Sequence, residues 1–200
     1  MLEAAIASAH VQIRGWDYPH IARGEELERH STWVGNDTDW EHKLELWRLY
    51  LSGQFASYTA MSYDWRDRSG LWPPSGAWAV GARLHVGDAI AVMSEFFLFA
   101  SRLALTAVGD EEMQMSLLVH GLQGRQLEED ELPWHFNALR SRVAKENEFT
   151  WAASLTRTEL VARHRDIAAE LSAQLFELFH WDDSLGVVHE RQSQIMGRST

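Results

Sequence analysis

The sequence predicts an α+β fold, a two-layer sandwich in which a mainly antiparallel sheet is covered by two long helices. Aromatic-rich segments with a hydrophobic period of two predict the strands. Two longer segments, with apolar residues at every third or fourth position, predict the helices. Glycine, proline and asparagine separate these segments, as is typical of connections.

The N-terminal part of the chain is expected to hold a short helix and two strands. Residues 2–9 favour the helix, residues 10–21 alternate as the first strand, and residues 22–39 read as a polar connection or an irregular edge. Residues 43–62 are the strongest strand candidate, because aromatic and aliphatic side chains suit a half-buried pleated surface. Gly53 within this segment indicates a bulge or a close approach by another group.

The first long helix is predicted at residues 86–108, with Gly109 as its C-terminal stop. Its polar stripe is narrow, so most of the helix should be buried; the stripe consists of Asp88, Glu95 and Arg102. Before this helix, residues 64–81 are too rich in glycine and proline for a regular element, and long connections of this kind are often functional. This stretch contains Trp65, Trp72 and Trp78.

The C-terminal part repeats the order of strands followed by a helix. Residues 112–122 and 149–155 alternate as the third and fourth strands, and residues 132–143 favour a short helix between them. Thr156 and Glu159 match a capping box, which predicts the start of the second long helix. This helix should end near residue 181, and residues 184–196 indicate a shorter terminal helix.

The chain is interpreted as a single α+β domain over residues 1–200, a length that allows a substantial core. The order of two strands and a helix, used twice, suggests a ββα-ββα pseudo-repeat with halves at residues 10–109 and 110–200. Residue identity between the halves is thin, so the repeat is a hypothesis.

The charge balance argues against a direct nucleic-acid partner. The formal net charge is −11, from 29 acidic and 18 basic side chains, whereas a protein that grips a phosphate backbone needs excess lysine and arginine. A local basic patch is the alternative, against a solvated helix face as the simpler interpretation; its residues are Arg157, Arg163, His164 and Arg165.

The absence of cysteine excludes disulfides and thiol chemistry and fits a cytoplasmic location. Residues 2–9 carry Glu3 and no basic leader, so we expect neither a signal peptide nor a membrane span. The chain could equally be an excised piece of a longer protein.

A catalytic signature is missing from the sequence. It contains no nucleophile elbow, Walker loop, dinucleotide-binding glycine pattern or zinc-protease helix. We therefore expect no cofactor and no metal site. Asp37, Asp39 and Glu41 alternate but lack the glycine and distal glutamate of a calcium loop, so a polar turn is the simpler interpretation. His180 is explained by helix capping.

Two features remain open to a functional interpretation. Glu95 lies on a very apolar helix, where it either pairs with Arg102 or the surroundings of Asp88, faces solvent in a narrow stripe, or anchors a cationic or hydrogen-bonding ligand. The ten tryptophans either build an aromatic recognition surface or fill a core and support association. Association is the favoured interpretation, because buried sheets use aromatic residues routinely.

Four segments resemble a region of known bacterial proteins: residues 14–21, 50–55, 95–104 and 178–182. They are similar to the region that follows the DNA-binding domain in proteins of the Schlafen-like AlbA type. The resemblance implies an accessory module of a regulatory or defence protein, which senses a ligand or holds subunits together. It transfers no catalytic residue.

The function predicted from the sequence is a non-catalytic sensory or self-association module that binds a small ligand or a protein partner, including a second copy of itself. Its predicted ligand-binding residues are Trp16, Asp17, His20, Tyr50, Gln54, Tyr58 and Glu95. The alternative is a small enzyme that uses Glu95, Asp17 and His20 as acid and base.

Overall fold

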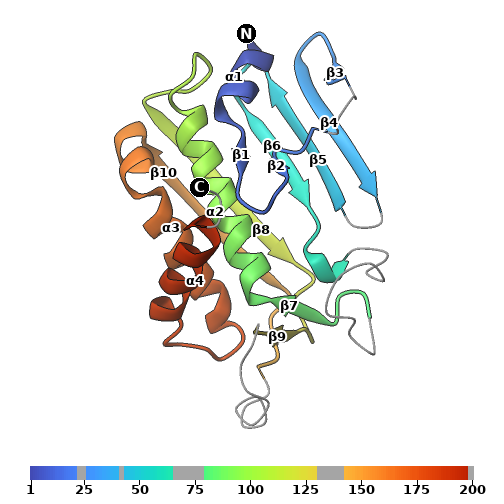
Figure 1. Cartoon of the computed structure of the whole chain (residues 1–200), viewed down its shortest axis with the longest axis vertical. Coiled ribbons are helices and arrows are strands. Elements are labelled where there is room, and N and C mark those ends of the chain that lie inside the picture. The colour runs from blue at the N-terminus through green and yellow to red at the C-terminus, as the bar shows by residue number, and fades with distance from the viewer. Residues whose placement is uncertain (22–25, 41–42, 65–78, 130–141, 198–200) are drawn as a thin grey trace.

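The computed structural model describes residues 1–21, 26–40, 43–64, 79–129 and 142–197, and it has an α+β fold. Its strands and helices form separate layers, with the helices gathered on one side of the strands (Figure 1). Residues 65–78, with Trp65, Trp72 and Trp78, and most of the short helix expected at 132–143 lie outside the described residues.

The N-terminal segment folds as a short helix followed by a small hairpin. Helix α1 (Leu2–Ala9) matches the prediction, but the strand expected over 10–21 is divided into β1 (Val11–Gln12) and β2 (Asp17–Tyr18). The two strands pair antiparallel. Gly15 lies between them with φ +91°, a left-handed conformation that a glycine adopts without strain.

The next four strands form an antiparallel sheet in the order β3-β4-β5-β6. These are β3 (Glu28–Arg29), β4 (Trp33–Trp40), β5 (Lys43–Tyr50) and β6 (Phe55–Thr59). The expectation of a connection over residues 22–39 was wrong where β3 and β4 lie; the alternative of an irregular edge fits the two-residue edge strand β3 but not β4. Polar and glycine residues in β4 hid its pattern, although Val34, Asn36 and Thr38 alternate as buried positions.

The single strand expected over residues 43–62 is a hairpin, because the chain turns between β5 and β6. Tyr50 accepts a hydrogen bond from the backbone amide of Gly53 (3.0 Å), and Gly53 has φ +85°. A Cβ at this glycine would lie 2.9 Å from the Val108 carbonyl oxygen. The predicted close approach at Gly53 is therefore confirmed, and a turn takes the place of a bulge.

Two short elements connect the sheet to the central helix. A 3₁₀ turn, η1 (Ser62–Asp64), follows β6, and strand β7 (Arg83–His85) pairs in parallel with β9 (Gln126–Glu128). Helix α2 (Val86–Leu103) then begins, with the side chain of His85 accepting a hydrogen bond from the Asp88 amide.

The C-terminal part is an antiparallel ribbon and two helices. Strand β8 (Glu112–His120) pairs over its whole length with β10 (Glu148–Thr156). Helix α3 (Arg157–Glu177) starts at the predicted capping box, in which Thr156 and Glu159 bond to each other's backbone amides. Helix α4 (Leu185–Gly197) confirms the predicted terminal helix.

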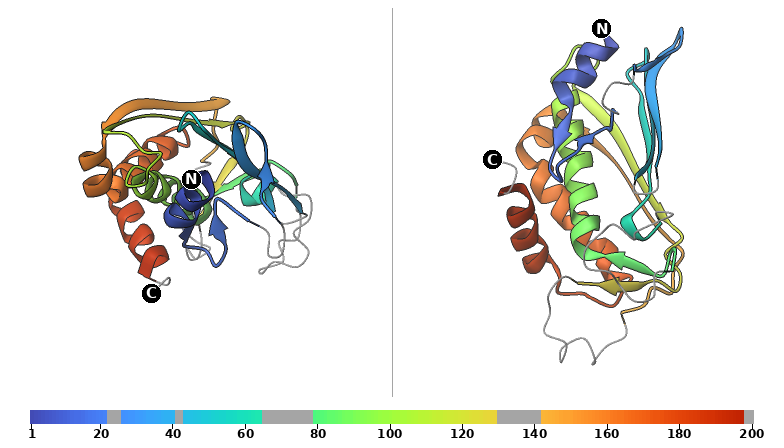
Figure 2. Two further views of the ribbon diagram at one scale, coloured as in Figure 1. Left: turned by 90° about the horizontal axis from the view of Figure 1, so that it is seen from above. Right: turned by 45° about the vertical axis from the view of Figure 1, so that its right-hand side comes forward.

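Helix α2 is shared by two hydrophobic clusters. One cluster joins α2 to α3 and the β8–β10 ribbon, and its buried members include Phe97. The other joins α2 to α1, β1 and the four-stranded sheet, and its members include Phe99 and Trp47. The views in Figure 2 show α2 between these parts. The predicted pseudo-repeat stays a hypothesis.

Candidate functional site

Arg14 binds two carboxylates of helix α2. Its Nε donates to one Glu95 oxygen at 3.0 Å and its Nη2 to the other at 2.6 Å, while its Nη1 donates to Asp88. Only 1% of the Glu95 side chain is exposed. The interpretation of Glu95 as part of a solvent-facing stripe was therefore wrong, and the predicted partner Arg102 instead donates to the His10 carbonyl.

The electrostatics of this group keep Arg14 charged. Burial alone would lower the pKa of Arg14, but the neighbouring Asp88 and Glu95 carboxylates outweigh burial and raise this pKa. The second oxygen of Asp88 accepts the Ser62 amide at 2.7 Å. The arginine thus ties the N-terminal hairpin to the first half of α2.

A second buried ion pair lies on the inner side of β5. Lys43 Nζ is 2.8 Å from Glu45 Oε2, and both side chains are at most 5% exposed. The ring of Trp16 lies against both cations, with its centroid 5.7 Å from the Arg14 guanidinium carbon and 5.3 Å from Lys43 Nζ. We call the five charged residues the buried charge cluster: Arg14, Lys43, Glu45, Asp88 and Glu95.

Three of the seven predicted ligand-binding residues lie at this cluster. Trp16 and Glu95 contact Arg14, and the backbone amide of His20 donates to Glu45 Oε1 at 3.0 Å. Asp17 lies in β2, opposite Gln12.

The remaining three predicted residues lie on the hairpin of the four-stranded sheet. Tyr50 ends β5, Gln54 belongs to the turn and Tyr58 lies on β6. The alternation of β5 buries Lys43, Glu45, Trp47 and Leu49, so Leu46 and Tyr50 point to the opposite face of the sheet. The residues that the sequence suggested as one binding site are therefore divided between the inner and the outer side of the four-stranded sheet.

The face opposite the helices carries aromatic side chains in register. Trp33 lies directly across from Tyr50, and Leu46 lies across from Tyr58. Tyr58 is 73% exposed and Leu46 36% exposed. We call this surface the outer aromatic face and define it by Trp33, Leu46, Arg48, Tyr50 and Tyr58. In Figure 2, the helices lie on the other side of these strands.

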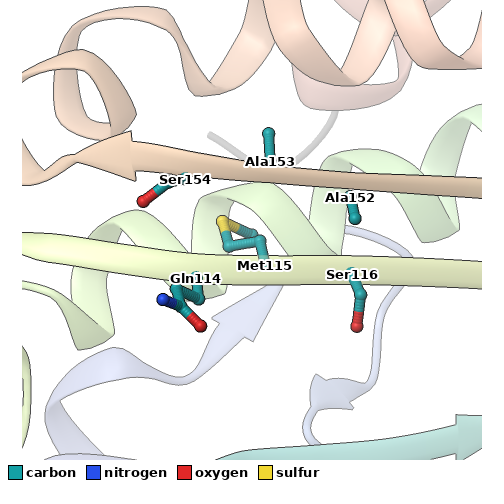
Figure 3. A pocket seen from close by; sticks show the side chains of 6 residues that line it. All are labelled: Gln114, Met115, Ser116, Ala152, Ala153 and Ser154. Atoms are coloured by element: carbon teal, nitrogen blue, oxygen red, sulfur yellow. The ribbon is translucent and has the colours of Figure 1, made fainter.

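Two shallow hollows lie on the outer side of the β8–β10 ribbon. The larger, about 470 Å³, is lined by small or flexible side chains, and Figure 3 shows how these lie along the two strands. The lining residues are Gln114, Met115, Ser116, Ala152, Ala153 and Ser154. Both hollows are open to solvent, and their walls offer little apolar area for a ligand to bury.

The geometry of the buried charge cluster is suited to holding structure together. Both Glu95 oxygens accept from a permanently charged arginine, so this carboxylate is poorly placed to exchange a proton with a substrate. Within the described ranges, no group of three or more histidine, aspartate or glutamate side chains has an arrangement that could hold a metal ion. None of the helices in those ranges is long and apolar enough to cross a membrane.

Sequence reasoning missed Arg14 as the partner of Glu95 and missed the ion pair of Lys43 with Glu45. Arg14 precedes Glu95 by 81 positions, and Lys43 and Glu45 looked like ordinary polar positions of a strand. The available signal was the period of β5, in which both charges share a face with Trp47 and Leu49.

The fold and these surfaces were compared with known proteins. A scan against models of protein families, a search of curated proteins and a search of solved structures each returned no match.

Proposed function

We propose that the chain is a non-catalytic association module that binds a protein partner through the outer aromatic face. The observation that carries this proposal is the pair Leu46 and Tyr58, which lie side by side on neighbouring strands and are both exposed. Exposed large apolar side chains grouped on a flat sheet face are typical of interaction sites.

The composition of the face supports a protein partner. Interface residues that dominate binding energy are enriched in tryptophan, tyrosine and arginine, and the outer aromatic face contains all three, as Trp33, Tyr50, Tyr58 and Arg48. The larger β8–β10 hollow offers mainly serine and alanine, and the smaller one adds Leu117, Leu118 and Trp151 but is equally open, so the hollows are the weaker candidate. A small-molecule ligand is a weaker hypothesis than a protein partner, because these hollows are shallow and open to solvent.

The resemblance to the region behind the DNA-binding domain of Schlafen-like AlbA-type proteins agrees with such a role. In that setting the module would serve a cytoplasmic regulatory or defence protein of bacteria, and the nucleic-acid work would belong to another domain. The net charge of −11 agrees with this division of labour.

Selection of peptides from a random display library on the immobilised protein tests the proposal. Peptides that bind wild type should lose binding to the double variant Leu46→Lys/Tyr58→Lys, because two charges would replace the exposed apolar pair. Leu118→Lys/Val161→Lys is the matched control, since both side chains are exposed elsewhere. Failure to enrich any peptide, or equal loss in both double variants, would contradict the proposal.

A further inference from the structure

Arg48 lies across the outer aromatic face and stacks on Trp33. Its guanidinium carbon is 4.3 Å from the centre of the Trp33 ring, a cation–π distance. The side chain passes directly over Gly35, where a Cβ would come within 2.5 Å of Arg48 Cδ and 2.3 Å of the Trp47 carbonyl oxygen. Gly35 therefore gives the arginine the room to lie flat on the sheet.

Two carboxylates hold the same guanidinium in place, and its Nη1 also donates to the carbonyl oxygens of Trp47 at 2.8 Å and Asn36 at 3.2 Å. Arg48 Nη1 is 2.5 Å from Asp37 Oδ1, and Nη2 is 3.4 Å from Glu28 Oε2. The Arg48 side chain is only 14% exposed, whereas Asp37 and Glu28 remain about half exposed, at 49% and 50%. A planar aromatic ring, two acceptors and an open approach are the parts of a guanidinium-binding site.

The outer aromatic face has a net negative charge even when the positive charge of Arg48 is included. Asp37 and Asp39 lie on the outer side of β4 and Glu28 lies on β3, and among the described residues of these strands Arg48 is the one cation on that side. Two copies of this face brought together would place like charges opposite each other, which is unfavourable. Nucleic acid would meet the same repulsion. A cationic protein segment is the occupant that both the rings and the carboxylates favour.

We propose that the outer aromatic face takes an arginine-bearing segment of a partner protein, and that Arg48 is an intramolecular placeholder of the same chemistry. This inference rests on the proposed function and names the partner's chemistry. One arginine of the segment packs on Tyr58 and Leu46 beside Asp37, and another competes with Arg48 for the ring of Trp33. The placeholder keeps Trp33 and the carboxylates paired until the partner arrives.

The probe is a short fluorescent peptide that alternates arginine and threonine, titrated with the purified protein at low and at physiological salt. The comparison peptide carries citrulline at every arginine, which keeps the shape and removes the charge. We expect the arginine peptide to bind at least about tenfold more tightly than the citrulline peptide, with binding that weakens as salt rises.

Substitutions on the face separate this site from the general attraction of an acidic protein. Asp39→Asn and Tyr58→Ala should each weaken peptide binding by about threefold or more. The matched controls are Asp166→Asn, which removes one exposed carboxylate from α3, and Leu118→Ala, which removes an exposed apolar side chain from β8. Equal weakening in Asp39→Asn and Asp166→Asn would overturn the proposal, because it would show that only net charge matters.

Arg48→Met gives the sharpest test, because a placeholder and a structural arginine predict opposite results. Removal of the placeholder exposes Trp33 and both carboxylates, so the arginine peptide should bind about threefold to tenfold more tightly. Arg165→Met, an exposed position on α3, makes the same change in net charge and should have little effect. Unchanged or weaker binding by Arg48→Met would overturn the placeholder.

Two results would distinguish failure of this inference from failure of the proposed association function. Display peptides that depend on Leu46 and Tyr58 but carry no excess of arginine would leave the association module standing and reject the cationic partner. Concentration-dependent dimerisation abolished by Leu46→Lys/Tyr58→Lys would identify a second copy as the occupant and would also reject this inference.

Discussion

Arg14 and Glu95 lie 81 positions apart in the chain and meet through two parallel hydrogen bonds. This two-point contact fixes both the position and the orientation of the guanidinium. Glu95 belongs to the buried face of α2, and Arg14 belongs to the N-terminal hairpin, so the contact joins the two ends of the first half of the chain. Its removal would leave carboxylates in an apolar environment.

Arg14→Met is expected to lower the free energy of unfolding by about 3–5 kcal/mol, because a buried ion pair that loses one partner leaves an uncompensated charge. The measurement is urea denaturation at pH 7. Arg29→Met is the control: this arginine pairs with Glu3 at the surface, where both side chains are about half exposed, at 61% and 46%. Similar losses in both variants would contradict the special role of the buried pair.

Tyr18 should make the protein sensitive to alkali. Burial, and next the nearby Glu45 carboxylate, raise the pKa of the Tyr18 hydroxyl. Because the folded pKa lies above the unfolded value of about 10, the stabilisation by the neutral phenol is complete below pH 10. It is lost as the pH rises from there towards the folded pKa.

Tyr18→Phe should therefore flatten the fall in unfolding free energy above about pH 10. At pH 7 the variant should lose about 1 kcal/mol, since Tyr18 Oη and Ser57 Oγ share a hydrogen bond of 3.0 Å. Denaturant titrations at several pH values measure both effects. Tyr58→Phe, at an exposed position, should keep the wild-type dependence of unfolding free energy on pH. If the curve for Tyr18→Phe ran parallel to the wild-type curve above pH 10, burial of the Tyr18 phenol would not be the cause of the alkaline sensitivity.

Phe97 and Phe99 test whether the molecule unfolds as one unit. They lie two positions apart on α2 but belong to different hydrophobic clusters, and each is at most 1% exposed. Either residue changed to alanine should cost about 3–5 kcal/mol. Because α2 is common to both clusters, each variant should shift a single transition seen equally by circular dichroism and tryptophan fluorescence. Two transitions, each shifted by one variant alone, would contradict this.

The helices of this protein could be predicted well from the sequence. Helix α3 begins at the capping box of Thr156 and Glu159, a local signal that depends on adjacent residues only. Helix α2 ends at Leu103, five residues before the predicted limit at 108. The prediction ran too far because the apolar pattern of the helix continues into the following turns, in which the Thr106 amide donates to Leu103 and the Gly109 amide to Thr106. Local patterns do not determine where a tertiary contact ends a helix.

The strands were harder to predict, because their limits depend on partners distant in the sequence. Trp33–Trp40 was overlooked since Gly35, Asp37 and Asp39 are poor strand formers. Two of these residues contact Arg48 once the sheet is formed: Gly35 lies beneath its side chain and Asp37 pairs with its guanidinium. The continuous strand expected over 43–62 failed for a related reason, because Gly53 serves both a turn and a close approach to Val108.

The candidate site could be predicted only in part. Glu95 was recognised from its apolar surroundings, and Tyr50 and Tyr58 were named as binding residues and lie on the outer aromatic face. The sequence could not reveal that Arg14 neutralises Glu95 from another element, or that Arg48 stacks on Trp33 across the sheet. Both contacts depend on strand register and on the docking of the N-terminal hairpin.

Helix α2 also limits how this chain can be divided. A cut of the chain after Gly109 would separate the four-stranded sheet from the β8–β10 ribbon. It would also expose the side of α2 that carries Phe97, because the residues that cover this side come from β8, β10 and α3. An N-terminal fragment made in this way would expose a row of apolar side chains along α2 and would aggregate. A recombinant protein that contained only the N-terminal half would need new apolar residues to cover this side of α2.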